Sequence, residues 1–278
     1  MAVFSYAGDI DTLMSPLDSI KYYKSFLRSG MVSIDPKTGF IKAWVGGVDY
    51  KHFKFDHVKQ GKNQVGSTFK PMVYATGIRE GMDPCQIVPN VLTCFDMPED
   101  QPRYCPRNSD GKYSGVVTLK EGLAKSMNNI TAWVLKQYGP EAVVKLAKDM
   151  GITSDLQAVP SLCLGVADIN LLEITAANAV FANRGVHIEP IFISRIEDKN
   201  GNSIFDALPK TREALDESTS YIMLELMKSV VNFGTGNRLR RPLPYGNIPY
   251  PIAGKTGTTQ NNSDGWFIGI TPELVTGV

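Results

Sequence analysis

Alternating apolar and polar positions are clearest near the two ends of the chain. The runs 31–34 and 40–45 are rich in β-branched and aromatic residues and flank a turn that contains proline and glycine, which predicts a hairpin. Near the other end, 251–259 and 266–270 predict two further strands, joined by a polar turn at 260–264. Terminal strands with helices between them favour an α/β (α+β) fold, in which the chain ends form one antiparallel sheet.

Between these strands the apolar residues recur with helical spacing. The segment after Ser67 is apolar on nearly every face and predicts a buried central helix. Thr118 and Glu121 form a capping box that starts another helix, which runs as far as Asn129. The helices predict an all-helical subdomain that packs beside the sheet. Further helices are predicted at 131–138, 141–150, 171–183 and 221–232, and an Asn-Gly hairpin at 191–205.

Three segments lack a clear period. We predict that residues 1–29 form a linker or an N-terminal arm packed on another part of the molecule, and that residues 30–278 form the main domain. Residues 48–66 predict a polar loop that leads to Ser67. The proline-containing stretch 83–115 predicts a second, longer loop, and loops of that length in compact domains are usually functional.

Composition and charge exclude several kinds of partner. The chain is 43% hydrophobic and 21% charged, as is ordinary for a globular protein. Its 29 basic and 28 acidic residues leave a net charge of +1, so we expect no nucleic-acid partner. No apolar run approaches the length of a membrane span, and the N-terminus lacks a signal-peptide pattern.

The cysteines and histidines are scattered. No two cysteines form a C-x-x-C pair and the histidines are not grouped with them, so we expect no metal site. Cys94 and Cys105 bracket a proline-rich loop and can pair in an oxidising compartment, or can stay reduced. The residues concerned are Cys85, Cys94, Cys105, Cys163, His52, His57 and His187.

Ser67 and Lys70 form the first candidate for chemistry. Three residues apart on a helix, they lie on one face, which brings an amine near a hydroxyl, as serine nucleophiles require. Pro71 is tolerated only in the first turn of a helix, so Ser67 is expected at the helix N-terminus. Gly66 is expected to leave space for a substrate. Alone, a Ser-x-x-Lys pair is weak evidence.

Two later motifs strengthen this hypothesis. Ser126 and Asn128 form a Ser-x-Asn motif at a helix junction. Lys255-Thr256-Gly257-Thr258 lies in a predicted strand, where the glycine would let an extended substrate lie alongside. Ser-x-x-Lys, Ser-x-Asn and Lys-Thr-Gly, in this order, resemble the motif set of class A β-lactamases and penicillin-binding proteins.

The resemblance extends beyond these motifs to most of residues 30–278. This part of the chain is similar to the transpeptidase domain of bifunctional class A penicillin-binding proteins, and that similarity implies a β-lactamase/transpeptidase-like fold. Gly265 departs from the alanine that is usual there. Since that family continues beyond Val278, we expect a C-terminally truncated domain without its last strand and C-terminal helix. The similar stretches are 64–71, 117–119 through 126–128, 181–186, 233–236, 254–259 and 264–269.

The family resemblance implies a peptidoglycan D,D-transpeptidase that crosslinks stem peptides through a serine acyl-enzyme. The acyl-enzyme forms at a D-Ala-D-Ala end, and β-lactams acylate the same serine. Stem peptides and β-lactams are therefore the expected partners, and no cofactor is expected. The implied location is the periplasmic face of the bacterial inner membrane. Contact with the membrane would be made only through an N-terminal part of the parent protein, with its anchor and glycosyltransferase domain, that this chain lacks.

The resemblance also implies a role for each motif residue. Ser67 would be the nucleophile, and Lys70 would accept its proton, with a pKa lowered by burial and by the charge of Lys255. Ser126 would relay the proton to the leaving group, and Asn128 would bind Lys70 and the substrate amide. The backbone N–H groups of Ser67 and Thr258 would form the oxyanion hole. The expected substrate contacts are Lys255, Thr256, Gly257, Thr258 and, as a cleft residue or only a helix stop, Thr235.

Two alternatives stay open at this point. A serine β-lactamase shares the motifs but needs a glutamate that activates the deacylating water. The nearest candidate, Glu173, is one residue further from Asn178 than that pattern requires, in what is predicted to be an ordinary amphipathic helix. The second alternative is a non-catalytic domain that senses or binds β-lactams.

Overall fold

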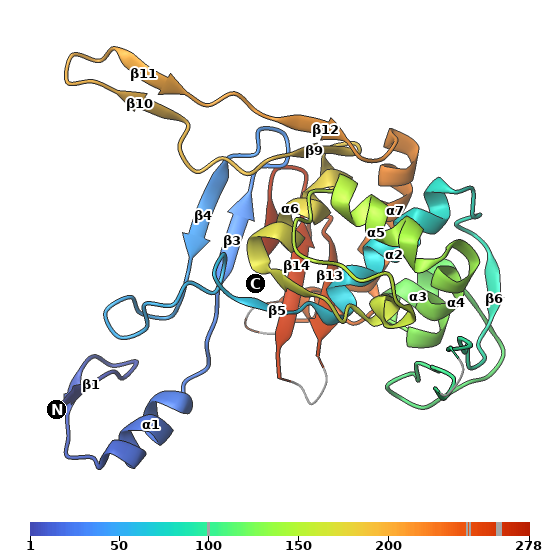
Figure 1. Cartoon of the computed structure of the whole chain (residues 1–278), viewed down its shortest axis with the longest axis horizontal. Coiled ribbons are helices and arrows are strands. Elements are labelled where there is room, and N and C mark those ends of the chain that lie inside the picture. Colours follow the sequence, from blue (N-terminus) through green and yellow to red (C-terminus); the bar gives the residue numbers. More distant parts are fainter. Residues whose placement is uncertain (99–100, 243, 245, 260–262) are drawn as a thin grey trace.

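The fold is built around a five-stranded antiparallel sheet formed by the two ends of the main domain. The computed structural model describes residues 1–98, 101–242, 244, 246–259 and 263–278. Strands run in the order β13-β14-β15-β3-β4, so the N- and C-terminal strands share one sheet, as predicted (Figure 1). The strands are β3 (Met31–Ile34), β4 (Ile41–Val45), β13 (Ala253–Thr258), β14 (Gly265–Ile270) and β15 (Val275–Gly277).

Strand β13 lies at the edge of this sheet. It pairs with β14 along its whole length, from Ala253 opposite Ile270 to Thr258 opposite Gly265. β15 pairs with both β14 and β3, so the sheet continues from β14 to the N-terminal strands. β14, the neighbour of the strand that carries Lys255, is thus paired on both sides, although we expected the domain to lack its last strand. Of the predicted turn at 260–264, residues 260–262 lie outside the described part of the chain.

Two helices cover the sheet. α6 (Leu171–Ala182) packs on β3, β14 and β15, and α7 (Glu217–Asn232) packs on β13. Ten of the twelve residues of α6 are buried, so this helix is not the amphipathic one that we predicted. The Asp216 side chain caps α7 by accepting the Thr219 N–H, and the helix therefore begins before the predicted Tyr221.

A helical layer lies beyond α6 and α7. Its centre is α2 (Lys70–Arg79), which packs on α4, α5 and α7 and has every residue except Arg79 buried. The expected helical subdomain also carries a short antiparallel ribbon, β6 (Ile87–Pro89) with β7 (Val116–Thr118). The other helices here are α3 (Leu119–Ala124), α4 (Asn128–Tyr138) and α5 (Pro140–Asp149).

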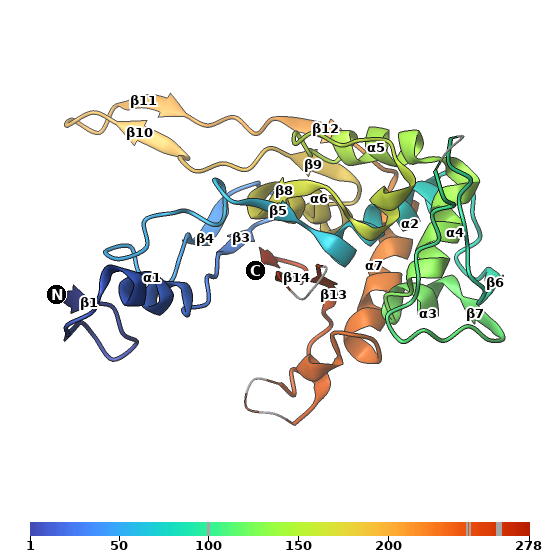
Figure 2. The same ribbon diagram turned by 60° about the horizontal axis from the view of Figure 1, so that its bottom comes forward.

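Short elements connect these layers. The predicted loop 48–66 contains β5 (Lys62–Gln64), which pairs with β8 (Asp168–Asn170). The Asn-Gly turn joins β10 (Arg195–Glu197) to β11 (Ser203–Asp206), and this hairpin extends outward beyond β9 (Val186–Ile188) and β12 (Thr211–Glu213) (Figure 2). Two 3-10 turns, η2 (Pro160–Leu164) and η3 (Asn237–Arg240), also belong to these connections. No helix within the described ranges is both long and apolar enough to cross a membrane.

The N-terminal segment forms a small unit of its own at one end of the molecule (Figure 1). It consists of β1 (Ala2–Val3), β2 (Ile10–Asp11) and α1 (Pro16–Lys24). Phe4 packs edge-on against Phe26 and Phe53, with ring centroids 5.1 Å apart in both pairs, which attaches the unit to the loop after β4.

Candidate active site

Ser67 lies on a tight turn between the sheet and the central helix. The turn is η1 (Gly66–Phe69), a 3-10 turn that runs directly into α2, with Pro71 in the first turn of that helix. Ser67 is therefore beside the helix N-terminus, as predicted, although the turn is tighter than an α-helix. The residue is half-buried and lines a cavity of about 620 Å³ together with Thr256 and Thr258 of β13.

Two glycines let the serine turn and β13 approach each other closely. Gly66 has φ +52°, and a Cβ at this position would lie 2.8 Å from the carbonyl oxygen of Thr258. A Cβ on Gly257 would lie 2.8 Å from both Val65 O and Thr68 Cγ2. Gly66 also lines the cavity at Ser67, so the expectation that it leaves room for a substrate stays a prediction, beside the room that it leaves for β13. Gly257 faces the serine turn and is absent from the described residues that line the cavity.

Ser126 occupies the junction of α3 and α4, where the sequence placed it. Its φ of +56° lies in the left-handed region, where a residue other than glycine is strained. This conformation turns its carbonyl oxygen toward Lys70 Nζ, 2.7 Å away. Its hydroxyl oxygen lies between two ammonium groups, 3.3 Å from Lys70 Nζ and 3.0 Å from Lys255 Nζ.

Lys70 is fully buried and donates to oxygens of Ser126 and Asn128, the latter at 2.6 Å. No salt bridge to Lys70 occurs within the described residues, and burial lowers the pKa of Lys70 to about 7. An appreciable fraction of Lys70 is therefore neutral near neutral pH. In the described part of the chain no hydrogen bond joins Lys70 Nζ to Ser67 Oγ. The amine donates to Ser126 and Asn128 of the Ser-x-Asn motif instead.

Lys255 is the second fully buried lysine of the site. It donates to Ser126 Oγ and, at 2.9 Å, to the carbonyl oxygen of Thr256. Its pKa is lowered, first by burial and then by the nearby charge of Lys70. We expected the charge of Lys255 to lower the pKa of Lys70. Burial is the cause at Lys70, and the repulsion between the two ammonium groups acts on Lys255.

Thr235 follows α7 and reaches the same cavity. Its N–H donates to Ala124 O at 3.0 Å, and its hydroxyl is 2.6 Å from the hydroxyl of Thr256. A Cβ on Gly234 would lie 2.2 Å from Ala124 O, so the glycine permits this contact with the end of α3. The Gly-Thr-Gly segment therefore both ends the helix and lines the cavity.

Several residues of the site were not singled out from the sequence. Asn128 Nδ2 donates to the carbonyl oxygen of Arg107, 2.7 Å away, so the long loop 83–115 reaches the catalytic motif. A disulfide between Cys94 and Cys105, one of the two alternatives left open, closes part of this loop. The long loop itself was the only signal for this contact. Other lining residues without a motif signal are Gln64, Ser109, Lys125, Leu164, Val166 and Thr259.

Cys163 also lies near Lys70 without a signal in the sequence. It is fully buried in η2, and burial raises the pKa of its thiol to about 12. The thiol is therefore neutral and gives Lys70 no counter-ion at neutral pH.

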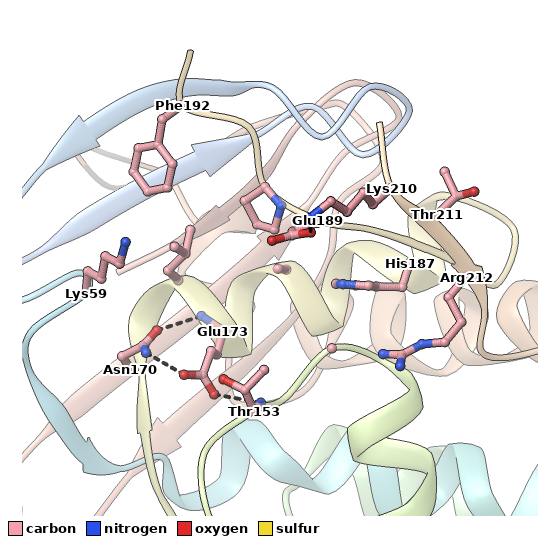
Figure 3. A pocket seen from close by; sticks show the side chains of 14 residues that line it. Lys59, Thr153, Asn170, Glu173, His187, Glu189, Phe192, Lys210, Thr211 and Arg212 are labelled. Carbon is pink, nitrogen blue, oxygen red and sulfur yellow. Dashed lines mark hydrogen bonds and ion pairs between the residues drawn. The ribbon is translucent and has the colours of Figure 1, made fainter. Parts of the chain in front are cut away.

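Glu173 lines a cavity of about 560 Å³ (Figure 3), which is different from the one that Ser67 lines. Its carboxylate accepts hydrogen bonds from Asn170 Nδ2 at 2.6 Å and from the backbone N–H groups of Thr153 and Ser154. It therefore holds the loop after α5 and does not face the serine. No group of three His, Cys, Asp or Glu residues that could hold a metal occurs in the described ranges.

The sheet, the serine turn and the paired buried lysines define a β-lactamase/transpeptidase-like protein. A family model, "Penicillin binding protein transpeptidase domain", matches residues 29–276, and the chain belongs to this family. A second model, "Penicillin-binding protein middle domain", matches residues 1–27, which form the N-terminal unit with α1. The division of the chain near residue 29 stays a prediction.

Individual relatives agree with this assignment. Penicillin-binding protein 1A of Aquifex aeolicus is 36% identical over 252 residues, which cover 91% of this chain and 34% of that protein. Penicillin-binding protein 2D of Bacillus subtilis is 35% identical over 266 residues, or 91% of this chain and 37% of that protein. The chain thus spans about a third of these relatives.

Solved structures share the fold. The crystal structure of penicillin-binding protein 1A from Haemophilus influenzae superposes with a TM-score of 0.83 at 26% identity, covering 90% of this chain and 42% of that one. The structure of the PonA1 protein from Mycobacterium tuberculosis in complex with penicillin V is similar in fold, with a TM-score of 0.74 at 22% identity. This match covers 94% of this chain and 72% of that one.

Proposed function

We propose that this domain is a peptidoglycan D,D-transpeptidase that forms an acyl-enzyme on Ser67 and is acylated there by β-lactams. The observation that carries the proposal is the arrangement around Ser126 Oγ, which contacts two buried lysines that lack carboxylate partners among the described residues. Such a pair supplies a base near neutral pH and a cation for a substrate carboxylate. The family assignment and the relatives named penicillin-binding protein 1A support it.

In the acylation step, Ser67 Oγ attacks the carbonyl carbon of the penultimate D-Ala. Neutral Lys70 accepts the hydroxyl proton, and the C–N bond to the terminal D-Ala then breaks. Ser126 Oγ, 3.3 Å from Lys70 Nζ, passes the proton to the departing nitrogen. An amine of a second stem peptide attacks the ester in the same way. The new amide forms, and the proton returns to Ser67.

The proposed binding groups lie on β13 and beside it. The Lys255 ammonium group is the proposed partner of the terminal carboxylate, whose negative charge would oppose the lowering of the Lys255 pKa by burial and by Lys70. The hydroxyls of Thr256 and Thr258 are further donors. The N–H groups of Ser67 and Thr258 are the proposed oxyanion hole, typically worth about 3 kcal/mol per donor. Because β13 is an edge strand, the donor peptide can add to it as another strand, with the Thr235 hydroxyl beside that of Thr256 as a further polar contact.

The disulfide supports an extracytoplasmic location, since disulfides persist in oxidising compartments such as the periplasm. We propose that the domain works at the periplasmic face of the inner membrane. Any membrane contact would be made by other parts of a longer parent protein.

Mass spectrometry of the protein incubated with penicillin tests the proposal. We expect one added penicilloyl group on Ser67 that persists for many minutes. Ser67→Ala should remain unlabelled, whereas the exposed-site control Ser114→Ala should label like the native protein. Release of the adduct within seconds would favour a β-lactamase. If the folded protein forms no adduct at all, a non-catalytic domain is favoured. Labelling that survives Ser67→Ala would show that the nucleophile is another residue.

A further inference from the structure

Helix α4, which carries Asn128, is capped by a residue from a distant loop. Its own N-cap residue, Met127, makes no side-chain cap hydrogen bond. Instead, Asn108 Oδ1 accepts the backbone N–H of Asn128 at 2.9 Å and that of Asn129 at 3.1 Å. Asn108 is only 7% exposed, so water does not readily replace it as an acceptor. The first turn of α4 therefore depends on Asn108 for its position.

The residue before Asn108 fixes the side chain of Asn128. Asn128 Nδ2 donates to Arg107 O at 2.7 Å, and Asn128 Oδ1 accepts from Lys70 Nζ at 2.6 Å. Rotating the amide by half a turn would place an NH₂ group against an amine and a carbonyl against a carbonyl. The 107–108 segment thus determines both where Asn128 lies and which of its amide atoms faces Lys70.

Asn108 is itself held rigidly. Its N–H donates to Tyr113 Oη at 2.9 Å and its Nδ2 donates to Lys112 O at 3.2 Å. The Cys94–Cys105 disulfide closes the loop that directly precedes this segment. All hydrogen-bonding atoms of the Asn108 side chain are therefore used inside the protein.

We propose that Asn108 is a positioning residue for acylation, which acts on Lys70 through Asn128. The inference rests on the proposed function of Ser67. A neutral lysine amine has two N–H groups and one lone pair. When Ser126 O and Asn128 Oδ1, the two nearest acceptors, take the two N–H groups, the lone pair is left to receive a hydroxyl proton, either from Ser67 or from Ser126, whose Oγ is 3.3 Å away. Loss of the Asn108 acceptor releases Asn128, and the lone pair is no longer held in one direction.

Penicillin acylation of three full-length variants tests this proposal, measured at pH 8.5, where Lys70, with a pKa of about 7, is mostly neutral. Asn108→Ala removes the acceptor, and Asn108→Asp keeps it. Asn90→Ala is the matched control, because Asn90 is an equally buried asparagine that bonds Asn129 Nδ2 without touching Asn128.

We expect the acylation rate constant of Asn108→Ala to fall about tenfold or more, since misplacing a reacting group by 1 Å can cost about 100-fold. The affinity of the preceding non-covalent complex should stay unchanged. Asn108→Asp should acylate faster than Asn108→Ala but below the native rate, because a carboxylate oxygen replaces the amide that donates to Lys112 O. Asn90→Ala should lower the melting temperature but acylate at the native rate. A native rate in Asn108→Ala, or equal losses in all three variants, would overturn the proposal.

Amide hydrogen exchange separates this inference from the proposed function. The backbone N–H groups of Asn128 and Asn129 should exchange at least tenfold faster in Asn108→Ala, and at the native rate in Asn90→Ala. This readout needs no acylation. If penicillin does not label the native protein, the transpeptidase proposal is wrong, and Asn108 then has no role in acylation. Unchanged exchange at Asn128 and Asn129 would overturn the capping role whatever the labelling result.

Discussion

The cavity at Ser67 and the cavity behind α6 differ in the surroundings of their buried nitrogen atoms. The cavity at Ser67, of about 620 Å³, has two fully buried lysines behind it that donate to neutral oxygens. The cavity behind α6, of about 560 Å³, is bordered by charged groups that are mostly exposed or paired, such as Lys210 with Glu189 at 3.2 Å. Among the described residues that line this cavity, Nδ1 of His187 is the one buried side-chain nitrogen without a hydrogen-bond partner.

This contrast shows that size alone does not identify a reactive site. Burial of an unpaired cation costs free energy, and the folded protein tolerates this cost at Lys70 and Lys255 because each amine is surrounded by oriented acceptors. Glu173 in the second cavity is held by neutral donors, as in an ordinary structural contact. The sharpest tests therefore change one group in each cavity and compare catalysis with stability.

Replacing Lys70 with methionine should have the largest effect. We expect acylation by penicillin to fall about 10³-fold, the usual contribution of a positioned general base. The same change should raise stability at pH 7 by about 1–3 kcal/mol, because it removes a buried charge. Acylation kinetics and urea unfolding measure the two effects, and a variant that acylates at the native rate would contradict the role of Lys70.

The gain in stability should depend on pH. The pKa of Lys70 is about 7 in the folded protein and 10.5 for the free side chain. Between these values the unfolded chain binds more protons, so the native protein becomes more stable as pH rises from 7 toward 10.5. The advantage of Lys70→Met should therefore be full below pH 7 and shrink by pH 9.5.

Gly66→Ala should come next, with a loss of about 2–3 kcal/mol of unfolding free energy. The left-handed conformation accounts for part of this cost and the 2.8 Å contact with Thr258 O for the rest. Acylation should slow as well, since β13 must move away from the serine turn. Gly265→Ala is the control, because a Cβ there meets nothing within 4 Å. If both variants unfold alike in urea, the close approach is not what requires Gly66.

Glu173→Gln should affect stability only. Loss of the charge weakens the hydrogen bonds from Thr153, Ser154 and Asn170, which should cost about 1–2 kcal/mol in thermal or urea unfolding. The lifetime of the penicilloyl enzyme should equal that of the native protein. A longer lifetime would instead mean that Glu173 activates the deacylating water, as in a β-lactamase.

His187→Leu should have the smallest effect, a gain of about 0.5–1 kcal/mol with native acylation. Leucine has a similar size and removes the buried, unpartnered Nδ1. The pKa of His187 is lowered from 6.5, first by burial and then by the charge of Arg212. The native protein should therefore lose stability as the pH falls below 6.5, and the variant should lack this loss. Melting curves at pH 7.5 and pH 5 check both points, and equal pH sensitivity would contradict them.

The sequence predicted those features whose causes are local. Alternation predicted the two hairpins of the sheet, and the cap at Thr118 located the start of α3. The assembly of Ser67, Ser126 and Lys255 into one site was implied only by the resemblance of the three motifs to a known motif set. The structure places Ser126 against Lys255 and on the same cavity as Ser67.

What the sequence did not predict depends on contacts between distant segments. Nothing near Gly66 indicates that β13 will lie against it, and nothing near Asn108 indicates that it will cap α4. The pattern of α6 suggested one exposed face, but that helix is covered by the sheet on one side and by α7, β8 and β9 on others. For the same reason the partners of Glu173 at Thr153 and Ser154 had no signal in the sequence.

The close packing of the serine turn limits how this domain can evolve. Gly66 and Gly257 face β13 and the turn, and a Cβ on Gly165 would lie 2.0 Å from Gly66 O, so a side chain at any of these three glycines would displace backbone next to Ser67. Inherited changes to the cavity should therefore accumulate where its lining is exposed and comes from other segments. Ser109 and Lys125 are two such residues.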